Sequence, residues 1–332
     1  MMIEQGEGFE IDYMPVGDGK SSGDAIVVKF GDLHSGDRSK FKVVVIDGGT
    51  LNSGNSIVDH LQDFTGDNVI DLAVVTHSDN DHVSGMQPIL ENCQVSALLM
   101  HAPWLAIEKL KFIKSLERAQ EIHEIALANG VTHYDPLIAT SFYGGQLKVL
   151  GPSVDYYVSL LPQFDGEPKM IGASTKQTVI ETSDPSTETL DDAHKYTSAT
   201  NNSSVILLFN LGDKRLLFAG DAGVEALSKA IETSMLQGDD LQNLYFLHVP
   251  HHGSHHNVNT ELIDFFNPGT SFISASALAQ KHPHPRVVNA FHRRELPIYS
   301  TKGHGLRYHY NAPDRQGWST APLAPFVQQF EV

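Results

Sequence analysis

The sequence predicts an α/β domain. Apolar runs of strand length, such as residues 70–75 and 244–249, each lead directly into a polar segment rich in histidine. Residues 105–129 carry apolar side chains at helical spacing and end at Asn-Gly, a frequent helix stop. A hydrophobic content of 41% and a charged content of 19% are typical of a globular chain.

Composition limits the organisation and the location of the chain. We expect one domain over residues 1–332, with residues 153–200, rich in Pro, Thr, Ser, Asp and Glu, as an insertion or lid; a disordered spacer is the alternative. The acidic start and the lack of a bilayer-length apolar run predict no signal peptide and no membrane insertion. Cys93 is the only cysteine, which favours a reducing cytoplasm.

The elements of the first half are predicted from periodicity and turn residues. We expect strands at 11–16, 25–30, 42–46, 70–75, 95–100 and 146–150, and helices at 57–64, from residue 83 onward, and at 105–129. A Gly/Ser-rich link, 17–24, joins the first two strands but lacks the spacing of a phosphate-binding P-loop.

The second half repeats this pattern. We expect strands at 205–209, 215–218, 244–249 and 271–276, helices at 224–231 and from 286 through 291, and a closing hairpin at 299–310. A Gly-Asp turn at 212–213 joins the first two of these strands.

Four candidate ligands follow the strand at 70–75: His77, Asp79, Asp81 and His82. Carboxylates packed so closely repel each other unless a positive charge lies between them. A divalent metal supplies that charge, and a pair of metals would use all four side chains. The alternative is a polar loop that caps the next helix, but capping needs one such residue.

This motif resembles the His-x-Asp-x-Asp-His variant found in metallo-β-lactamase-fold hydrolases. Val249-Pro250-His251-His252-Gly253-Ser254 and the His-Pro-His-Pro segment 282–285 resemble signatures of the hydrolase domain of ComEC-type DNA-uptake proteins, and the first motif is also similar to that of phosphorylcholine esterases. The resemblance covers roughly residues 10–310. It implies a four-layer αββα fold, in which two mixed β-sheets lie between helices.

The resemblance also implies the site. His77, Asp79 and Asp221 would hold a first metal ion, and Asp81, His82 and His251 a second, with Asp221 bridging both. An exchange of His251 and His252 remains open, since the second histidine would serve as a hydrogen-bonding or acid/base group. Asp47 would orient the metal loop through hydrogen bonds.

Further residues are expected around the metals. His284 and Arg286 would contact a phosphate oxygen, with His284 also assigned to catalysis beside Asp81 and His252. No histidine takes the place of the family's third ligand for the first metal. Asn201 is expected there instead, either as a weak ligand, as a residue holding a water, or in contact with substrate.

The sequence therefore predicts a metal-dependent hydrolase, most favourably a phosphodiesterase with a dinuclear Zn or Mn site and a bridging hydroxide. The alternatives are a non-catalytic metal-binding sensor or partner-binding module, and a hydrolase of a lactam or thioester. A net charge of −17 disfavours a long polyanion as substrate. We thus expect a small phosphodiester, or a nucleic acid delivered with help from a partner protein.

Overall fold

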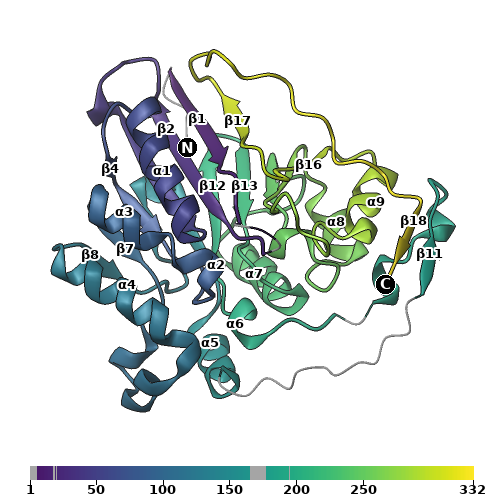
Figure 1. Cartoon of the computed structure of the whole chain (residues 1–332), viewed down its shortest axis with the longest axis horizontal. Coiled ribbons are helices and arrows are strands. Elements are labelled where there is room, and N and C mark those ends of the chain that lie inside the picture. The colour runs from purple at the N-terminus through teal and green to yellow at the C-terminus, as the bar shows by residue number, and fades with distance from the viewer. Residues whose placement is uncertain (1–5, 18, 20, 165–176, 194) are drawn as a thin grey trace.

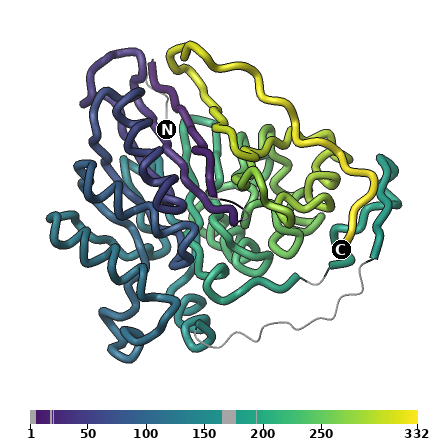
Figure 2. Tube along the Cα trace, in the orientation of Figure 1, coloured from purple at the N-terminus to yellow at the C-terminus, as the bar shows by residue number. Residues whose placement is uncertain are grey.

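Two β-sheets face each other between two layers of helices (Figures 1 and 2). The computed structural model describes residues 6–17, 19, 21–164, 177–193 and 195–332. Each large sheet of this part of the chain contains seven strands, and each mixes parallel with antiparallel pairs. The predicted four-layer αββα fold is confirmed.

The first sheet contains strands from the N-terminal half and one C-terminal strand. Its strands, in spatial order, are β17 (Leu306–Tyr310), β1 (Glu7–Tyr13), β2 (Ala25–Asp32), β3 (Phe41–Gly48), β5 (Leu72–Val74), β7 (Ala97–Leu99) and β8 (Thr132–Tyr134).

The second sheet contains strands from the later part of the chain. Its strands, in spatial order, are β16 (Ile298–Ser300), β15 (Ser271–Ile273), β14 (Phe246–His248), β13 (Lys214–Phe218), β12 (Ile206–Leu211), β10 (Leu147–Gly151) and β9 (Ser141–Phe142). Two short pairs lie outside both sheets: β4 (Val69–Ile70) with β6 (Gln94–Val95), and β11 (Thr178–Ile180) with β18 (Gln329–Glu331).

The helices cover the outer faces of the sheets. They are α1 (Leu51–Phe64), α2 (Asn80–Val83), α3 (Met86–Asn92), α4 (Glu117–Ala128), α5 (Val154–Leu160), α6 (Ala199–Asn202), α7 (Val224–Leu236), α8 (Thr260–Phe266) and α9 (Pro285–Arg293). In Figure 1, α1, α3 and α4 lie outside the first sheet, and α8 and α9 lie on the side of the second.

Alternation along the strands separates the core into layers. In β3, Val44 and Ile46 point into the space between the sheets, where they join Phe209 and Phe218 of the second sheet. Val43 and Val45 point the other way and belong to the core formed with the helices. Both faces of these strands are thus buried, which explains their nearly continuous apolar sequences.

The predicted helix at 105–129 is only half correct. The α-helix occupies Glu117–Ala128, and 3₁₀ helices at Pro103–Leu105, Glu108–Phe112 and Lys114–Leu116 precede it. Leu110, Ile113 and Leu116 recur every three residues, a spacing that fits the three-residue turn of a 3₁₀ helix as well as an α-helix. Ile113 is extended, with φ −78° and ψ 117°, and interrupts the helical run.

The predicted hairpin at 299–310 is wrong. β16 pairs in parallel with β15, whereas β17 pairs with β1 in the other sheet. The residues between them therefore cross from one sheet to the other, and Leu306 enters the core between the sheets. Gly303 makes this crossing with φ +87°, a conformation that favours glycine.

Part of the segment at 153–200 is regular structure. It contains α5, β11 and α6, and β11 pairs with β18 close to the C-terminal end (Figure 1). Its role as an insertion or lid stays a prediction, and residues 165–176 and 194 of it lie outside the described residues. In the described part of the chain, none of the helices combines the length and apolar character that crossing a bilayer requires.

Candidate metal centre

His77, Asp221 and His252 lie close together because the strands before them end at one edge of the facing sheets. His77 follows β5, Asp221 follows β13, and His252 follows β14. The carboxyl ends of parallel strands lie on the same side of a sheet, which brings the segments after them together. Glycine allows the segment after α2 to lie very close to the end of β3. A Cβ on Gly85 would lie only 1.9 Å from the carbonyl oxygen of Gly48.

Hydrogen bonds fix the orientation of His82. Its Nδ1 lies 2.8 Å from Asp47 Oδ2, so Nδ1–H donates to that carboxylate. Asp47 also accepts hydrogen bonds from the Thr76 amide at 2.8 Å and the Thr76 hydroxyl at 2.6 Å. Nε2 of His82 is then the ring atom that carries a lone pair, and it is buried without a hydrogen-bond partner. Asp47 thus lies where the sequence predicted an orienting carboxylate.

His252 and His77 are oriented in the same way. Nδ1 of His252 donates to the carbonyl oxygen of Ser274 at 3.0 Å. Nδ1 of His77 lies 3.0 Å from the Thr76 hydroxyl and 3.3 Å from that of Ser204. In both rings Nε2 is buried and unpartnered.

Asp221 lies among these three Nε2 atoms. Its Oδ1 is 3.4 Å from Nε2 of His82, and its Oδ2 is 3.8 Å from Nε2 of His77 and 3.9 Å from Nε2 of His252. Burial opposes its ionisation, but His251, His82 and His252 hold the pKa of Asp221 well below its usual value. The buried Oδ1 has no hydrogen-bond donor.

These atoms fit divalent metal ions. Buried polar atoms are nearly always paired, so four convergent unpaired ones in a single place indicate a missing ligand. Imidazole nitrogen and carboxylate oxygen are donors that bind Zn²⁺ and Mn²⁺. In the described part of the chain, two groups of candidate donors occur, and the donor atoms within each group lie within 4.8 Å of one another: Asp24, His82, Asp221 and His252 form one, and Asp47, His77 and His82 the other.

Asp79 and Asp81 differ in position. The Asp79 carboxylate is 3.7 Å from Nε2 of His77, and its side chain is 40% exposed. It makes no capping hydrogen bond to α2, so it does not serve as the helix cap of the alternative interpretation. Asp81 is partly exposed in the first turn of α2 and belongs to neither donor group. Its role as a ligand and in catalysis stays a prediction.

His251 lies at the same centre but in a more open position. Its Nδ1 is 2.9 Å from Asn257 Oδ1, while Asn257 donates its amide to the carbonyl oxygen of Asp221 at 2.8 Å. This arrangement leaves Nε2 of His251 without a proton, 3.6 Å from Asp221 Oδ2. The side chain is 29% exposed, against 4% for His252.

Asn201 is buried beside His251 and Asp221. Its side-chain nitrogen lies 3.4 Å from Asp221 Oδ2 and 3.3 Å from Nδ1 of His251, and its oxygen accepts a hydrogen bond from Ser198 at 2.7 Å. The oxygen is therefore engaged, and the amide group faces the centre. In this orientation the amide group can donate to a carboxylate or a substrate oxygen, and the role of Asn201 as a weak ligand stays a prediction.

The structure places His282, not His284, beside the centre. The His282 ring lies 5.4 Å from that of His251 and 6.0 Å from that of His252. Burial, together with these two rings, lowers the pKa of His282 to about 3. His284 caps α9 by accepting the Arg286 amide at 3.2 Å, and its ring packs against His255. The two side chains, two residues apart in this proline-rich loop, therefore lie beside different partners, which the motif alone could not assign.

Asp24 and His248 are the residues that sequence reasoning missed. Both oxygens of Asp24 are buried without hydrogen-bond donors, and Oδ2 lies 3.3 Å from Nε2 of His248 and 3.7 Å from Nδ1 of His82. Burial opposes ionisation of Asp24, but His248, His82 and His252 lower its pKa. The available signal was its position directly before a strand, at the end of the glycine-rich link.

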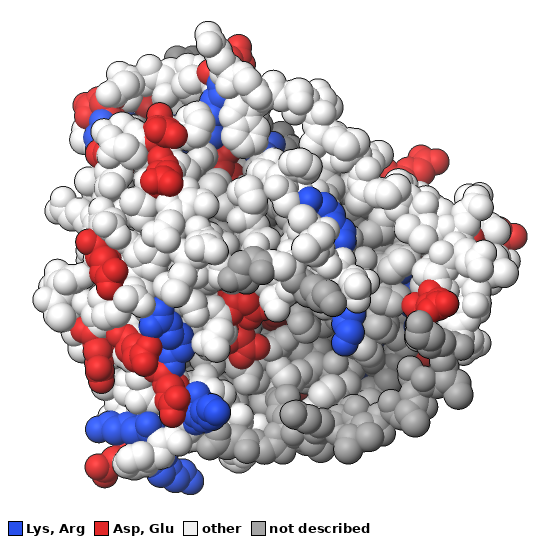
Figure 3. Space-filling view, viewed as in Figure 1, with Lys and Arg blue, Asp and Glu red and all other residues white. Residues whose placement is uncertain are grey.

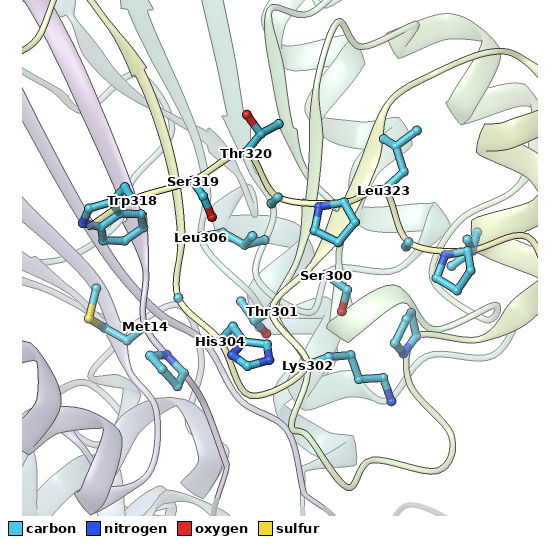
Figure 4. A pocket seen from close by; sticks show the side chains of 18 of the residues that line it. Met14, Ser300, Thr301, Lys302, His304, Leu306, Trp318, Ser319, Thr320 and Leu323 are labelled. Carbon is cyan, nitrogen blue, oxygen red and sulfur yellow. The ribbon is translucent and has the colours of Figure 1, made fainter. Parts of the chain in front are cut away.

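A separate cavity of about 900 Å³ lies under the C-terminal segment. Figure 4 shows Met14 and Trp318 on one side of it, and Lys302 and Ser300 on the other. None of the residues around this cavity is a candidate metal ligand. The cavity is therefore distinct from the centre built by His77, His82, His252 and Asp221.

The visible surface carries no large basic area. In Figure 3, the Lys and Arg side chains that do gather lie where Figure 1 places α4 and the segment before it, and Asp and Glu side chains lie among them. This mixture agrees with the net charge of −17.

Comparisons with known proteins agree with this geometry. The family model described as the Metallo-beta-lactamase superfamily matches residues 38–277. The chain is 25% identical over 243 residues to ComE operon protein 3 of Bacillus subtilis (strain 168). The aligned region makes up 73% of this chain and 25% of that protein, so the chain spans about a quarter of the length of this relative.

Solved structures with similar folds share little sequence with the chain. A new diphosphatase from the PhnP family is 12% identical, with a TM-score of 0.43 over 91% of this chain and 97% of that one. CmlA, a diiron β-hydroxylase from Streptomyces venezuelae, is also 12% identical, with a TM-score of 0.45 over 91% of this chain and 54% of that one.

Proposed function

Because the chain belongs to the metallo-beta-lactamase superfamily, whose members are typically hydrolases, we propose that it is a metal-dependent phosphodiesterase. The observation that carries the proposal is the convergence of three unpartnered Nε2 atoms, from His77, His82 and His252, on the Asp221 carboxylate. Two divalent ions held there would activate water at neutral pH and neutralise charge on a phosphate. Either Zn²⁺ or Mn²⁺ suits these donors.

We propose the exchange of His251 and His252 that the sequence left open. His252 is the ligand, because its Nε2 is buried and its Nδ1 is occupied by a backbone carbonyl. His251 faces the substrate instead, with a partly exposed ring and an unprotonated Nε2 that can accept a proton. His282 packs beside it, with the ring centres 5.4 Å apart, and helps to exclude water.

Binding of the phosphodiester uses groups that donate hydrogen bonds. The Asn201 amide is fixed by Ser198 and lies beside Asp221, where it can donate to a substrate oxygen. Hydrogen bonds from preorganised donors become stronger where water is excluded and charge develops. Asn201 therefore orients the substrate, whereas His251 moves the proton.

The substrate is a small or locally bound phosphodiester. The net charge of −17 disfavours tracking along a long polyanion without a partner protein. A nucleic acid presented by such a partner is the second candidate, favoured by the resemblance of the sequence motifs to the hydrolase domain of ComEC-type DNA-uptake proteins.

Parallel assays test this function. The metal-loaded chain should hydrolyse bis(p-nitrophenyl) phosphate, with a chromogenic β-lactam and a thioester as comparison substrates, and Asp221→Asn should abolish the reaction. Preference for the lactam or the thioester would contradict the proposal. Metal binding without hydrolysis of any of the three would favour the non-catalytic sensor.

A further inference from the structure

A second group of basic side chains lies on the other side of the loops that form the metal centre. The loop after β14 directs His251 and His252 toward Asp221 in the metal centre and His255 toward His284, whose ring lies 3.9 Å away. The second loop, 282–286, directs His282 toward His251. His255 is three positions after His252 in the chain, so their Cα atoms lie within roughly 11 Å of each other.

Arg286 is the unusual member of this group. The residue is 8% exposed, and its Nε is buried without an acceptor. Among the described residues, none forms a hydrogen bond or an ion pair with its guanidinium. Arginine carries five N–H donors and is always charged, so burial without an acceptor is costly unless an anion binds.

Lys195 adds a second positive charge to this group, and Asp191 and Asp192 are the carboxylates near it. Lys195 donates to the carbonyl oxygens of Leu190 at 2.6 Å and His255 at 2.8 Å, and its closest carboxylate oxygen, from Asp191, is 3.9 Å away. Its third N–H remains available to a ligand. Burial lowers the pKa of His284 to about 4, together with Arg286, His256 and, less strongly, Lys195.

One carboxylate, Glu181, also faces His284 but is already engaged. Its Oε1 accepts from the Thr189 amide at 3.0 Å, and its Oε2 accepts from Asn289 at 2.8 Å and Arg293 at 3.1 Å. It therefore cannot neutralise Arg286 as well. The wall is completed by Phe330, whose ring lies 5.7 Å from that of His284, where Figure 1 places β18 beside α9.

We propose that Arg286, Lys195 and His284 form a subsite for a second phosphate group, next to the phosphodiester that is hydrolysed. This inference rests on the proposed phosphodiesterase function and narrows its substrate. The preferred substrate carries a phosphate monoester or a further diester within one nucleotide-sized unit of the scissile bond. Charge-assisted hydrogen bonds to the planar guanidinium select phosphate at this position.

Two substrates that differ by one phosphate test the proposal. Thymidine 3′-(p-nitrophenyl phosphate) is compared with its 5′-phosphorylated form on the metal-loaded enzyme. The 5′-phosphate should raise kcat/KM by about tenfold or more, mainly through KM, as expected for a charge-assisted hydrogen bond. Arg286→Met should bring the ratio of the two kcat/KM values down to about one. Arg286→Lys, which keeps the charge but not the planar fork, should lower the ratio less.

Arg294→Met is the matched control. Arg294 follows the same helix and carries the same charge, but it is paired with Asp264 and Glu188. This variant should keep the wild-type ratio, so that a loss in Arg286→Met cannot be ascribed to net charge. A wild-type ratio near one, or an unchanged ratio in Arg286→Met, would overturn the subsite.

Calorimetric binding of inorganic phosphate separates the two proposals. If neither thymidine ester is hydrolysed, the phosphodiesterase proposal fails. Binding of inorganic phosphate then decides by itself whether the subsite exists. Wild type and Arg294→Met should bind phosphate at least about tenfold more tightly than Arg286→Met. Equal binding by all three proteins would reject the subsite whatever the activity, and Arg286→Lys provides the comparison if the methionine variant does not fold.

Discussion

Asp47 Oδ2 lies 2.8 Å from Nδ1 of His82, and this hydrogen bond sets the ring so that Nε2 points to Asp221. Such a carboxylate fixes the tautomer of a ligand histidine and raises its basicity. Asp47 adopts φ +56°, uncommon for a residue with a side chain, and it is completely buried. The backbone at the end of β3 is thus bent to deliver this contact.

We therefore expect Asp47→Asn to weaken metal binding about 10- to 100-fold, the usual effect of losing such a partner. Competition with a chelator measures the change. Asp71→Asn is the control, because Asp71 accepts from the Val43 amide at 2.9 Å but has no contact with the candidate ligands. Equal affinities for the two variants would show that Asp47 has no role in the metal centre.

The two neighbouring histidines should respond differently. His252→Ala removes a buried ligand and should leave about one metal ion per chain, because the second site loses a nitrogen donor. His251→Ala should retain both ions and reduce kcat. Elemental analysis beside steady-state kinetics distinguishes them, and the reverse pattern would restore His251 as the ligand.

Asp24→Asn tests the carboxylate that sequence reasoning missed. The charge of Asp24 is buried among His82, His248 and His252 without a hydrogen-bond donor of its own. Its removal should lower affinity for the metal beside His82 and His252 by about tenfold or more. An affinity equal to that of wild type would assign Asp24 to the fold alone.

The sequence predicted the parts of the site that follow strands. His77, His82 and Asp221 each come after an apolar run, and the edge of a sheet brings such residues together. The resemblance to ComEC-type domains is confirmed by the similarity to ComE operon protein 3. These inferences needed only residue type and the place where a strand ends.

The orientation of the histidine side chains was harder to predict. His251 and His252 are adjacent, and both adopt positive φ, so no strand or helix periodicity determines which ring turns inward. His282 and His284 lie in a proline-rich loop, where the fold of other segments decides the facing side. The crossing between β16 and β17 likewise depends on β1, which lies almost 300 residues away and supplies the pairing edge.

Stability at low pH should depend on Glu10. Burial opposes its ionisation, but Arg315, Lys29 and Arg307 lower its pKa from 4.5 to about 2. Since the folded pKa is the lower one, the ionised group stabilises the native state above pH 4.5, and the effect disappears as the pH falls toward 2. The ionised Glu10 contributes on the order of 3 kcal/mol to the free energy of unfolding.

Glu10→Gln should therefore lower the free energy of unfolding at pH 7 more than at pH 3. Urea titrations at the two values measure the difference. A variant that loses the same amount at both pH values would show that the charge of Glu10 does not stabilise the fold.

We propose above all that His77, His82, His252 and Asp221 hold a pair of metal ions for phosphodiester hydrolysis. The most direct test is a titration of metal-free protein with Mn²⁺ or Zn²⁺, in which hydrolysis of bis(p-nitrophenyl) phosphate is followed against equivalents added. We predict that activity rises until two equivalents per chain are bound and then stops. Saturation of binding at one equivalent, or two bound equivalents without hydrolysis, would contradict the claim.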